Sequence, residues 1–309
     1  MIPTRLKFAL LAAAALASVG PVPQLAAQPA PAAAASTLQQ MERISVEVRG
    51  TTGSPVILLP GLSSPRAVWD GVASDLARTH RVYLVQVNGF GGDDPRANLR
   101  PGILDGIVSE IRTLIRDQSL EQPAIVGHSM GGLVGLILAA RHPDSVGRLM
   151  TVDALPFFSV LMAPAGSDVT VAMVEPRAAQ MRDAVAASYG KPADPAAADA
   201  NVATMTLRAE HRPMLRDWAM ASDPRVAAQV IYEDLTTDMR PELAQIRAPV
   251  TVVYAWNDTL PRQEQADAFF RRQYTGLPRG SFVGIGGAAH FVMLDQPEQF
   301  ISALISFLE

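Results

Sequence analysis

Short runs of apolar residues alternate along the chain with segments whose apolar positions recur every three or four residues. Short apolar runs between turn residues are typical of buried strands, and the longer spacing is typical of helices packed on a core. The predicted strands cover residues 44–48, 56–59, 82–87, 124–126, 149–152, 250–255 and 281–285, and the predicted helices cover 66–77, 103–115, 133–140 and 297–308. This alternation predicts an α/β protein whose mostly parallel sheet carries helices on both faces.

Residues 155–240 interrupt the alternation. They are rich in Ala, Met and Arg, predict several helices and contain no convincing strand. The triplet Ser-Asp-Pro at 222–224 is typical of a helix start, so a helix is predicted from there to Leu235. An insertion between two strands of a parallel sheet lies over their carboxyl ends, where ligands bind. We therefore expect a core of residues 41–154 and 241–309, with residues 155–240 as a helical cap, or lid.

The first 40 residues differ in composition from the rest of the chain. Two basic residues precede an apolar run over residues 8–19, and small residues follow. This order is that of a secretory signal peptide, and the run is shorter than the roughly 20 residues that span a membrane. We predict a signal peptide over residues 1–27, cleaved between Ala27 and Ala35, and a disordered tether over residues 28–40. The expected location is the periplasm or the medium, with no stable membrane anchor after removal of the signal.

Charge and cysteine content exclude several classes of protein. The net charge is −4, which provides no basic surface for nucleic acid or anionic membranes. The absence of cysteine excludes disulfides, thiolate metal sites and a cysteine nucleophile. The dinucleotide fingerprint fails at Asp94, and neither a phosphate loop nor a His-Glu-x-x-His motif is present. We therefore expect no cofactor, no metal and no nucleic-acid partner, and a small molecule as substrate.

The motif Gly-His-Ser-Met-Gly-Gly at residues 127–132 lies between the predicted strand 124–126 and the helix that follows. Gly-x-Ser-x-Gly alone is weak evidence, since roughly one chain in ten of this length carries it by chance. In a strand–turn–helix, however, the serine is forced into a strained conformation and its hydroxyl is exposed above the sheet. The sequence therefore predicts Ser129 as a nucleophile, and the alternative is a glycine-rich turn that only joins strand to helix.

A serine nucleophile needs a base, and the five histidines can be sorted by position. His290 follows the predicted strand 281–285 and a small Gly-Gly-Ala-Ala segment, which places it at a strand's carboxyl end. In this architecture the chain order is serine, acid, histidine, which leaves His290 and His211, the latter in the insertion. We predict His290 as the base, and a structural role for His128, which lies inside the turn.

Two aspartates compete for the third catalytic position, in which a carboxylate orients the histidine and stabilises its cation. Asp258 follows the predicted strand 250–255, and Asp153 ends the predicted strand 149–152. We predict Asp258 as the triad acid, with Asp153 as its rival. A helix cap or a solvated loop acid is the alternative for either residue.

Two further features are expected around the serine. The backbone N–H groups of Met130 and Leu62 are predicted to form the oxyanion hole, because one follows the nucleophile and the other follows an early strand. The apolar stretch at the start of the insertion, with Phe157, Phe158 and Met162, is predicted to line the substrate pocket. The alternative for this stretch is packing of the insertion onto the sheet.

Together these segments resemble the α/β-hydrolase superfamily, in particular its lid-bearing, esterase-like members. The resemblance covers residues 44–308 and rests on the serine motif, on Leu-Leu-Pro-Gly-Leu at 58–62, Gly-Phe-Gly at 89–91, Trp-Asn-Asp at 256–258 and Ala-His-Phe at 289–291. It implies an eight-stranded sheet with a helical cap after the sixth strand. Many relatives carry His-Gly where this chain has Pro60-Gly61. The oxyanion donor is a backbone N–H and does not need that histidine, but the shape of the loop without the histidine's hydrogen bonds is not predicted.

The predicted function is hydrolysis of carboxylic esters through an acyl-enzyme intermediate. Small to medium neutral esters are expected, because the apolar stretch contains no cluster of Arg or Lys to receive a charged acyl group. A lactonase, thioesterase or peptidase would use the same residues. A catalytically inactive binding protein of the same fold is the alternative from another class, and its usual sign is a missing triad member.

Overall fold

A computed structural model describes residues 37–164, 166–192, 194–258 and 262–309, all within the compact unit Ala34–Glu309. The predicted signal peptide and residues 28–36 of the predicted tether lie outside the described residues. The strands are β1 (Thr37–Gln40), β2 (Ile44–Arg49), β3 (Pro55–Leu59), β4 (Arg81–Val87), β5 (Ala124–His128), β6 (Arg148–Val152), β7 (Val250–Trp256) and β8 (Gly280–Gly286). The α-helices are α1 (Asp70–Leu76), α2 (Ile103–Asp117), α3 (Met130–Arg141), α4 (Val171–Ala186), α5 (Pro195–Val202), α6 (Arg212–Ala221), α7 (Pro224–Thr236), α8 (Gln263–Gln273), α9 (Val292–Asp295) and α10 (Pro297–Leu308).

The strands form one sheet in the order β1-β2-β4-β3-β5-β6-β7-β8. Strands β1 and β2 are antiparallel to their neighbours, and the strands from β4 to β8 are parallel to one another. The predicted fold, a mostly parallel eight-stranded sheet, is therefore confirmed. Residues 37–40, which we predicted as tether, instead form the edge strand β1, with Thr37 opposite Val48. Their polar, largely exposed sequence gave no strand signal.

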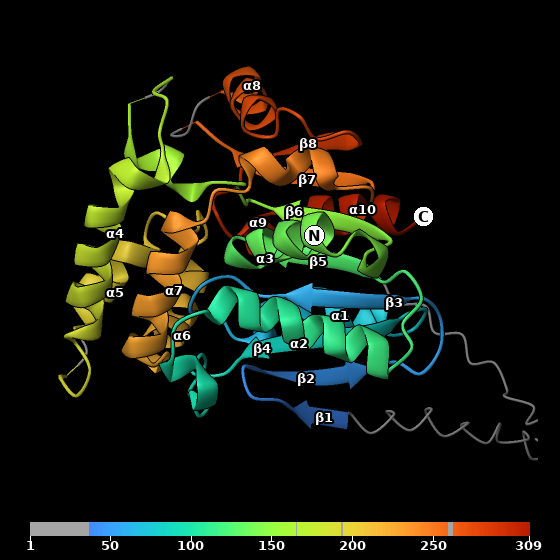
Figure 1. The fold of residues 1–309 in the computed structure, drawn as a ribbon, viewed down its shortest axis with the longest axis horizontal. Coiled ribbons are helices and arrows are strands. Elements are labelled where there is room, and N and C mark those ends of the chain that lie inside the picture. Colours follow the sequence, from blue (N-terminus) through green and yellow to red (C-terminus); the bar gives the residue numbers. More distant parts are fainter. Residues whose placement is uncertain (1–36, 165, 193, 259–261) are drawn as a thin grey trace, which may run out of the picture. The chain divides into compact units, whose positions relative to one another are not determined.

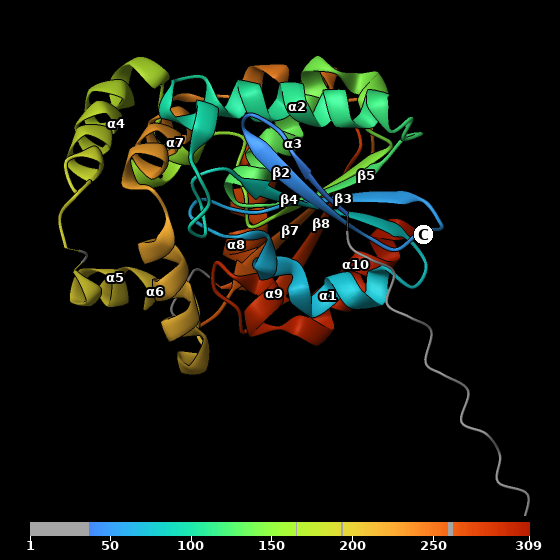
Figure 2. The same cartoon turned by 90° about the horizontal axis from the view of Figure 1, so that it is seen from below.

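Helices cover both faces of the sheet (Figure 2). One face is packed by α2, α3 and α8, and the other by α1, α9 and α10. Helix α3 is buried along its whole length except at Arg141, which places it in the centre of the molecule's core, where an all-round apolar helix belongs. The serine motif thus stands between a fully buried strand and a fully buried helix.

Helices α4 to α7 form the cap, which the chain builds between β6 and β7. Figure 1 shows these helices at the end of the sheet toward which β3 and β5 point. Helix α4 packs along α7, and α5 against α6. Helix α7 begins as predicted: the Asp223 carboxylate accepts the N–H of Arg225 at 2.9 Å, and Pro224 takes the first helical position.

Candidate active site

Ser129 occupies the sharp turn between β5 and α3. Its backbone has φ 53° and ψ −123°, a region that L-residues rarely adopt. The turn is held on both sides: the Ser129 N–H donates to the carbonyl of Val152 at 2.9 Å, and the Ser129 carbonyl accepts the N–H of Gly132 at 2.8 Å. This hydrogen-bonded, strained turn is the geometry that the motif predicts for a nucleophile.

Glycines are required where backbone segments approach each other around this turn. A Cβ atom on Gly127 would lie 2.2 Å from the carbonyl oxygen of Gly131, which is closer than real atoms come. A Cβ atom on Gly61 would lie 3.1 Å from the Cβ of Ser129 and 2.8 Å from Nδ1 of His128. The loop after β3 therefore packs its backbone directly against the serine.

Asp153 binds the predicted base. Its Oδ2 lies 2.7 Å from Nδ1 of His290, and its Oδ1 accepts the N–H of Ala255 at 3.3 Å. Asp153 follows β6 directly and has φ 46°, so it shares a strained backbone conformation with Ser129. The two residues are adjacent in space, because the Ser129 N–H bonds to Val152, the residue before Asp153.

The structure brings Asp153 to His290 where we predicted Asp258, which lies exposed in the turn after β7. The path of the His290 loop gives the physical reason. After β8 the chain crosses over the end of β7, where the Gly287 N–H donates to the carbonyl of Trp256 at 2.9 Å. Because that crossing is complete by residue 287, His290 lies over β6 and reaches the acid at the end of that strand.

Two further side chains hold the His290 loop through hydrogen bonds to its backbone carbonyls. His128 Nε2 donates to the His290 carbonyl at 2.9 Å, and Asn257 Nδ2 donates to the Ala288 carbonyl at 2.6 Å. Burial, reinforced by the neighbouring His290, lowers the pKa of His128 well below its usual value, which keeps its imidazole neutral. The predicted structural role of His128 agrees with these contacts.

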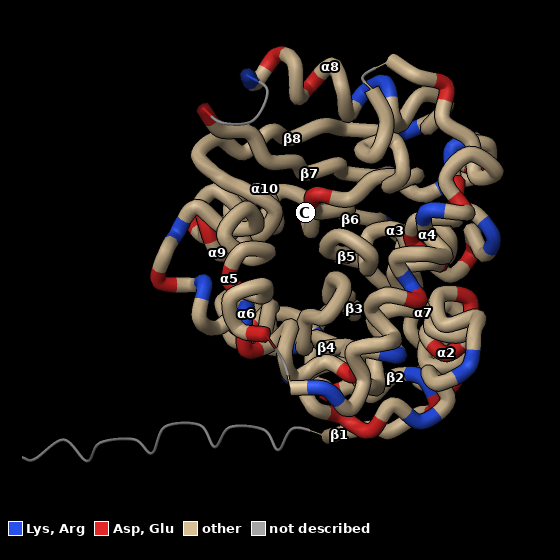
Figure 3. The backbone as a smooth tube through the Cα atoms, turned by 90° about the vertical axis from the view of Figure 1, so that its left-hand side faces the viewer, with Lys and Arg blue, Asp and Glu red and all other residues tan. Residues whose placement is uncertain are grey.

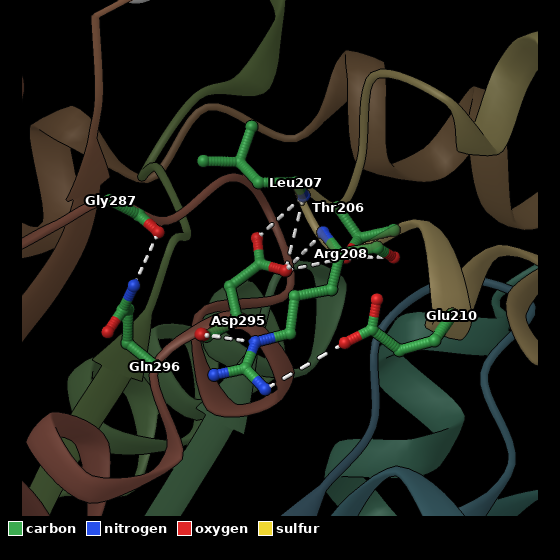
Figure 4. A network of polar contacts seen from close by, with 7 residues as sticks. All are labelled: Thr206, Leu207, Arg208, Glu210, Gly287, Asp295 and Gln296. Atoms are coloured by element: carbon green, nitrogen blue, oxygen red, sulfur yellow. Dashed lines mark hydrogen bonds and ion pairs between the residues drawn. The ribbon is translucent and has the colours of Figure 1, made fainter.

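Asp295 ties the same loop to the cap (Figure 4). Its buried carboxylate accepts the hydroxyl of Thr206 at 2.5 Å and the N–H groups of Leu207 and Ala289 at 3.1 and 2.8 Å. Arg208 adds a bond from Nε to the Asp295 carbonyl at 3.0 Å. One carboxylate therefore joins the segment that enters α6 to the residue before His290. Asp295 has no distinctive signal in the sequence, since an aspartate that ends a short helix belongs to no motif.

The two predicted oxyanion donors lie next to Ser129. Met130 is the first residue of α3, where N–H groups have no acceptor within the helix. In the turns, loops and caps of the described residues, neither the Met130 N–H nor the Leu62 N–H donates to a backbone carbonyl. Leu62 belongs to the loop whose Gly61 packs on Ser129, so both donors stand beside the nucleophile.

Two cavities flank the candidate site. One, of about 280 Å³, lies beside the acid and base and is lined by Asp153, Leu155, Phe158, Leu161, Ala255, Ala266, Phe269, Phe270 and His290. The other, of about 310 Å³, lies between the cap and the sheet, where Leu62 and Phe291 face Met205, Trp218 and Ile231. Both are mainly apolar, as substrate pockets usually are.

Of the three predicted pocket residues, only Phe158 lines one of these cavities. Phe157 is fully buried with Val169 in a small cluster within the cap, and Met162 is 42% exposed. Residues 158–162 form a 3-10 helix, which turns Phe158 and Leu161 toward the cavity. Helix α8 supplies a second wall, with Phe269 and Phe270, that the sequence did not indicate.

The described residues contain no group of three or more His, Cys, Asp or Glu side chains placed to hold a metal ion. Over the same residues, no helix is long and apolar enough to span a membrane.

The strained serine turn, at the crevice where a parallel sheet meets its cap, defines the α/β-hydrolase class. Sequence comparison supports the same class. The family model for the alpha/beta hydrolase fold matches residues 54–297, and the chain belongs to this family. The predicted family and fold are thus confirmed.

The relatives with curated names include two pimeloyl-[acyl-carrier protein] methyl ester esterases. The one from Edwardsiella ictaluri is 28% identical over 266 residues, which is 82% of this chain and 93% of the relative. The one from Aeromonas hydrophila is 28% identical over 269 residues, which is 86% of this chain and 99% of the relative. The predicted class, an enzyme that cleaves esters, agrees with these names.

Solved structures share the fold at lower identity. An enol-lactonase from Burkholderia xenovorans superimposes with a TM-score of 0.68 at 19% identity, covering 86% of this chain and 96% of that one. An esterase from Exiguobacterium antarcticum gives a TM-score of 0.69 at 18% identity, covering 85% and 94%. At this level of identity the likeness concerns the fold alone.

Proposed function

We propose that this protein hydrolyses carboxylic esters through an acyl-enzyme intermediate, with Ser129, His290 and Asp153 as the catalytic triad. The observation that carries the proposal is the 2.7 Å bond between Asp153 and His290 at the end of β6, one residue after the carbonyl that holds the Ser129 N–H. A carboxylate on Nδ1 of a histidine next to a strained serine is the arrangement that activates a serine hydroxyl.

The steps follow from this geometry. Ser129 Oγ attacks the ester carbonyl carbon while His290 Nε2 takes the hydroxyl proton, and Asp153 stabilises the imidazolium through Nδ1. The N–H groups of Met130 and Leu62 stabilise the oxyanion. His290 then returns the proton to the leaving alcohol, and a water molecule, activated by the same histidine, releases the acid from Ser129.

The charges of the cap favour a small neutral substrate. Residues 155–240 contain eight Lys and Arg and eleven Asp and Glu, a net charge of −3. Several of these arginines pair within the cap, as Arg225 does with Asp223 and Arg240 with Asp238, both at 2.6 Å. Figure 3, viewed onto the cap, shows the two signs interspersed. Because both signs alternate along the described part of the cap, we infer that a free ester is preferred over the carrier-protein ester that the curated relatives' names specify.

The cavity beside His290 is the proposed acyl pocket. Its walls are mostly apolar, so each additional CH₂ of an acyl chain gains up to ~0.8 kcal/mol on burial. We expect kcat/KM to rise from acetyl to butyryl or hexanoyl esters by roughly tenfold or less. A lactone or thioester would meet the same catalytic groups and belongs in the same substrate panel.

The test combines a covalent probe with that panel. A fluorophosphonate should label the wild-type protein once, at Ser129, and the Ser129→Ala variant should neither be labelled nor cleave p-nitrophenyl butyrate. Esters, lactones, thioesters and peptides are then compared with purified protein. A folded wild type that resists labelling and cleaves none of them would make the inactive binding protein the correct reading.

We also propose that the protein is exported to the periplasm or the medium. The support is the order of basic, apolar and small residues over residues 1–27. N-terminal sequencing of protein from the native host should begin between about residues 27 and 36. An intact Met1 on protein recovered from the cytoplasm would contradict this proposal.

A further inference from the structure

Asp234 is a buried carboxyl in the last turn of α7 that the triad does not use. It is 8% exposed, and its Oδ1 is buried with no hydrogen-bond partner among the described residues. Buried polar groups in folded proteins almost always have a partner, so an orphaned carboxyl oxygen needs an explanation.

The position of Asp234 gives the fold no benefit. Burial raises its pKa to about 7, and the carboxyl end of a helix disfavours negative charge. Its neighbour Glu233 is used differently: the two oxygens of Glu233 accept the N–H groups of Gly102 and Leu104 at 2.7 and 2.9 Å, which caps α2. Of two adjacent acids, one is fully satisfied and the other is left open.

Asp234 lies on the side of α7 that faces the cavity between the cap and the sheet. On α7 it follows Ala227 and Ile231 at helical spacing, and both of those residues line the cavity between the cap and the sheet. His290 is near enough for its positive charge to act on the Asp234 carboxyl. Asp234 therefore lies on the cavity-facing side of α7, within electrostatic range of His290.

From its burial, its unpartnered oxygen and its position on α7 we infer that Asp234 is a substrate-binding residue, which accepts a hydrogen bond from, or donates one to, a hydroxyl on the acyl or alcohol part of the ester. A hydroxyl fits because it both donates and accepts, so it can pair with the protonated carboxyl and with the carboxylate. The cavity that Ala227 and Ile231 line has mainly apolar walls, so one polar anchor at its edge would decide the orientation of the substrate. This inference rests on the proposed ester hydrolysis and narrows its substrates to hydroxy esters.

Matched ester pairs test the inference. Ethyl 3-hydroxybutanoate is compared with ethyl butanoate for the acyl side, and 2-hydroxyethyl butanoate with propyl butanoate for the alcohol side. In the wild type, kcat/KM for the hydroxylated member of at least one pair should exceed that of its plain partner by roughly tenfold. In Asp234→Leu this ratio should fall to about one, and Asp234→Asn, whose amide still donates and accepts, should retain most of it. Asp217→Asn, at an exposed acid on α6, is the matched control and should keep the wild-type ratio.

The outcomes separate this inference from the ester hydrolysis on which it rests. A wild type that cleaves plain esters with no gain from a hydroxyl overturns the inference alone, as does a gain that survives in Asp234→Leu. Equal loss on both members of a pair would make Asp234 a support for His290 and would also overturn it. If Asp234→Leu does not fold, Asp234→Ala gives the same comparison. Absence of both fluorophosphonate labelling and ester cleavage would instead count against the proposed function.

Discussion

The acids around His290 and the buried acid of the cap differ in their hydrogen bonds. Around His290, Asp153 at the end of β6 accepts two hydrogen bonds, and Asp295 at the end of α9 accepts several, one of them from the residue before His290. In the cap, Asp234 is buried with one oxygen unpartnered. Polar groups with all their hydrogen bonds made rigidify a site, whereas a buried polar group that lacks one can form it with a ligand. Under the proposed function, the sheet supplies the reaction geometry and the cap selects the substrate.

The largest expected effect is on the sheet side of this comparison. Asp153→Asn should lower kcat by as much as about 10⁴, because an amide on Nδ1 favours the wrong tautomer of His290. Asp258→Asn, in the exposed turn after β7, should change kcat far less. Steady-state kinetics of both variants, with circular dichroism as a control for folding, decides between the acids. A larger loss in Asp258→Asn would return the role of triad acid to the residue that the sequence analysis favoured.

On the cap side, the pH dependence of stability should carry the signature of Asp234. Its pKa rises from 3.8 in the unfolded chain to about 7 in the fold, so between these values the folded protein holds a proton that the unfolded chain has released. The contribution of Asp234 to stability therefore falls as pH rises from about 4 to 7, by up to about 4 kcal/mol, and is constant above that range. Urea denaturation of the wild type and Asp234→Asn across this range measures it: the variant should gain on the wild type as pH rises. Parallel curves would show that Asp234 has an ordinary pKa.

A third prediction concerns the junction of the two regions. Asp295→Ala removes the acceptor of Thr206, Leu207 and Ala289 and should lower the free energy of unfolding by about 3 kcal/mol, with a fall in kcat as the His290 loop loosens. Glu210→Gln, which removes an exposed partner 4.0 Å from Arg208, should cost less than about 1 kcal/mol. Urea titration and kcat are measured on both. Wild-type kcat in a folded Asp295→Ala variant would mean that the loop holds its shape without the cap.

The smallest expected effect is on acyl selectivity. Phe158→Ala enlarges the cavity beside His290, so the advantage of butyryl over acetyl esters in kcat/KM should shrink by about threefold, which corresponds to less than 1 kcal/mol. Met162→Ala, at the far end of the same 3-10 helix and partly exposed, should leave that ratio unchanged. A change in the Met162 variant alone would place the acyl chain on the outer side of this helix.

The features that could be predicted from the sequence are those that a local pattern determines. The motif around Ser129 and the loop position of His290 are local features, and the structure places both at the same edge of the sheet. The choice between Asp153 and Asp258 depended on where the chain crosses β7, which is a property of packing that no local pattern encodes. For the same reason Phe157 and Phe158, adjacent and chemically identical, could not be told apart until the 3-10 helix fixed which one lines the cavity.

Asp234 and β1 show a second limit. With Asp234 on its inner side, α7 has the pattern of an ordinary amphipathic helix. The sequence does not reveal that the neighbouring Glu233 already caps α2. Strand β1 consists of mostly polar residues whose pairing with β2 comes from backbone hydrogen bonds, and these do not depend on side-chain pattern.

Thr206 and Leu207 donate hydrogen bonds to Asp295, and the Met205 carbonyl accepts the N–H of Phe291, so the cap helps to hold His290 in place. On heating, the enzyme should therefore lose activity before it unfolds globally. Once thermal motion detaches the cap, the loop before and after His290 loses its partners from residues 205–208, while the sheet beneath still has its hydrogen bonds and its core. Turnover should then be lost at a lower temperature than the main calorimetric transition. Cooling should restore it, because only the hydrogen bonds between the Asp295 carboxylate and its donors have to form again.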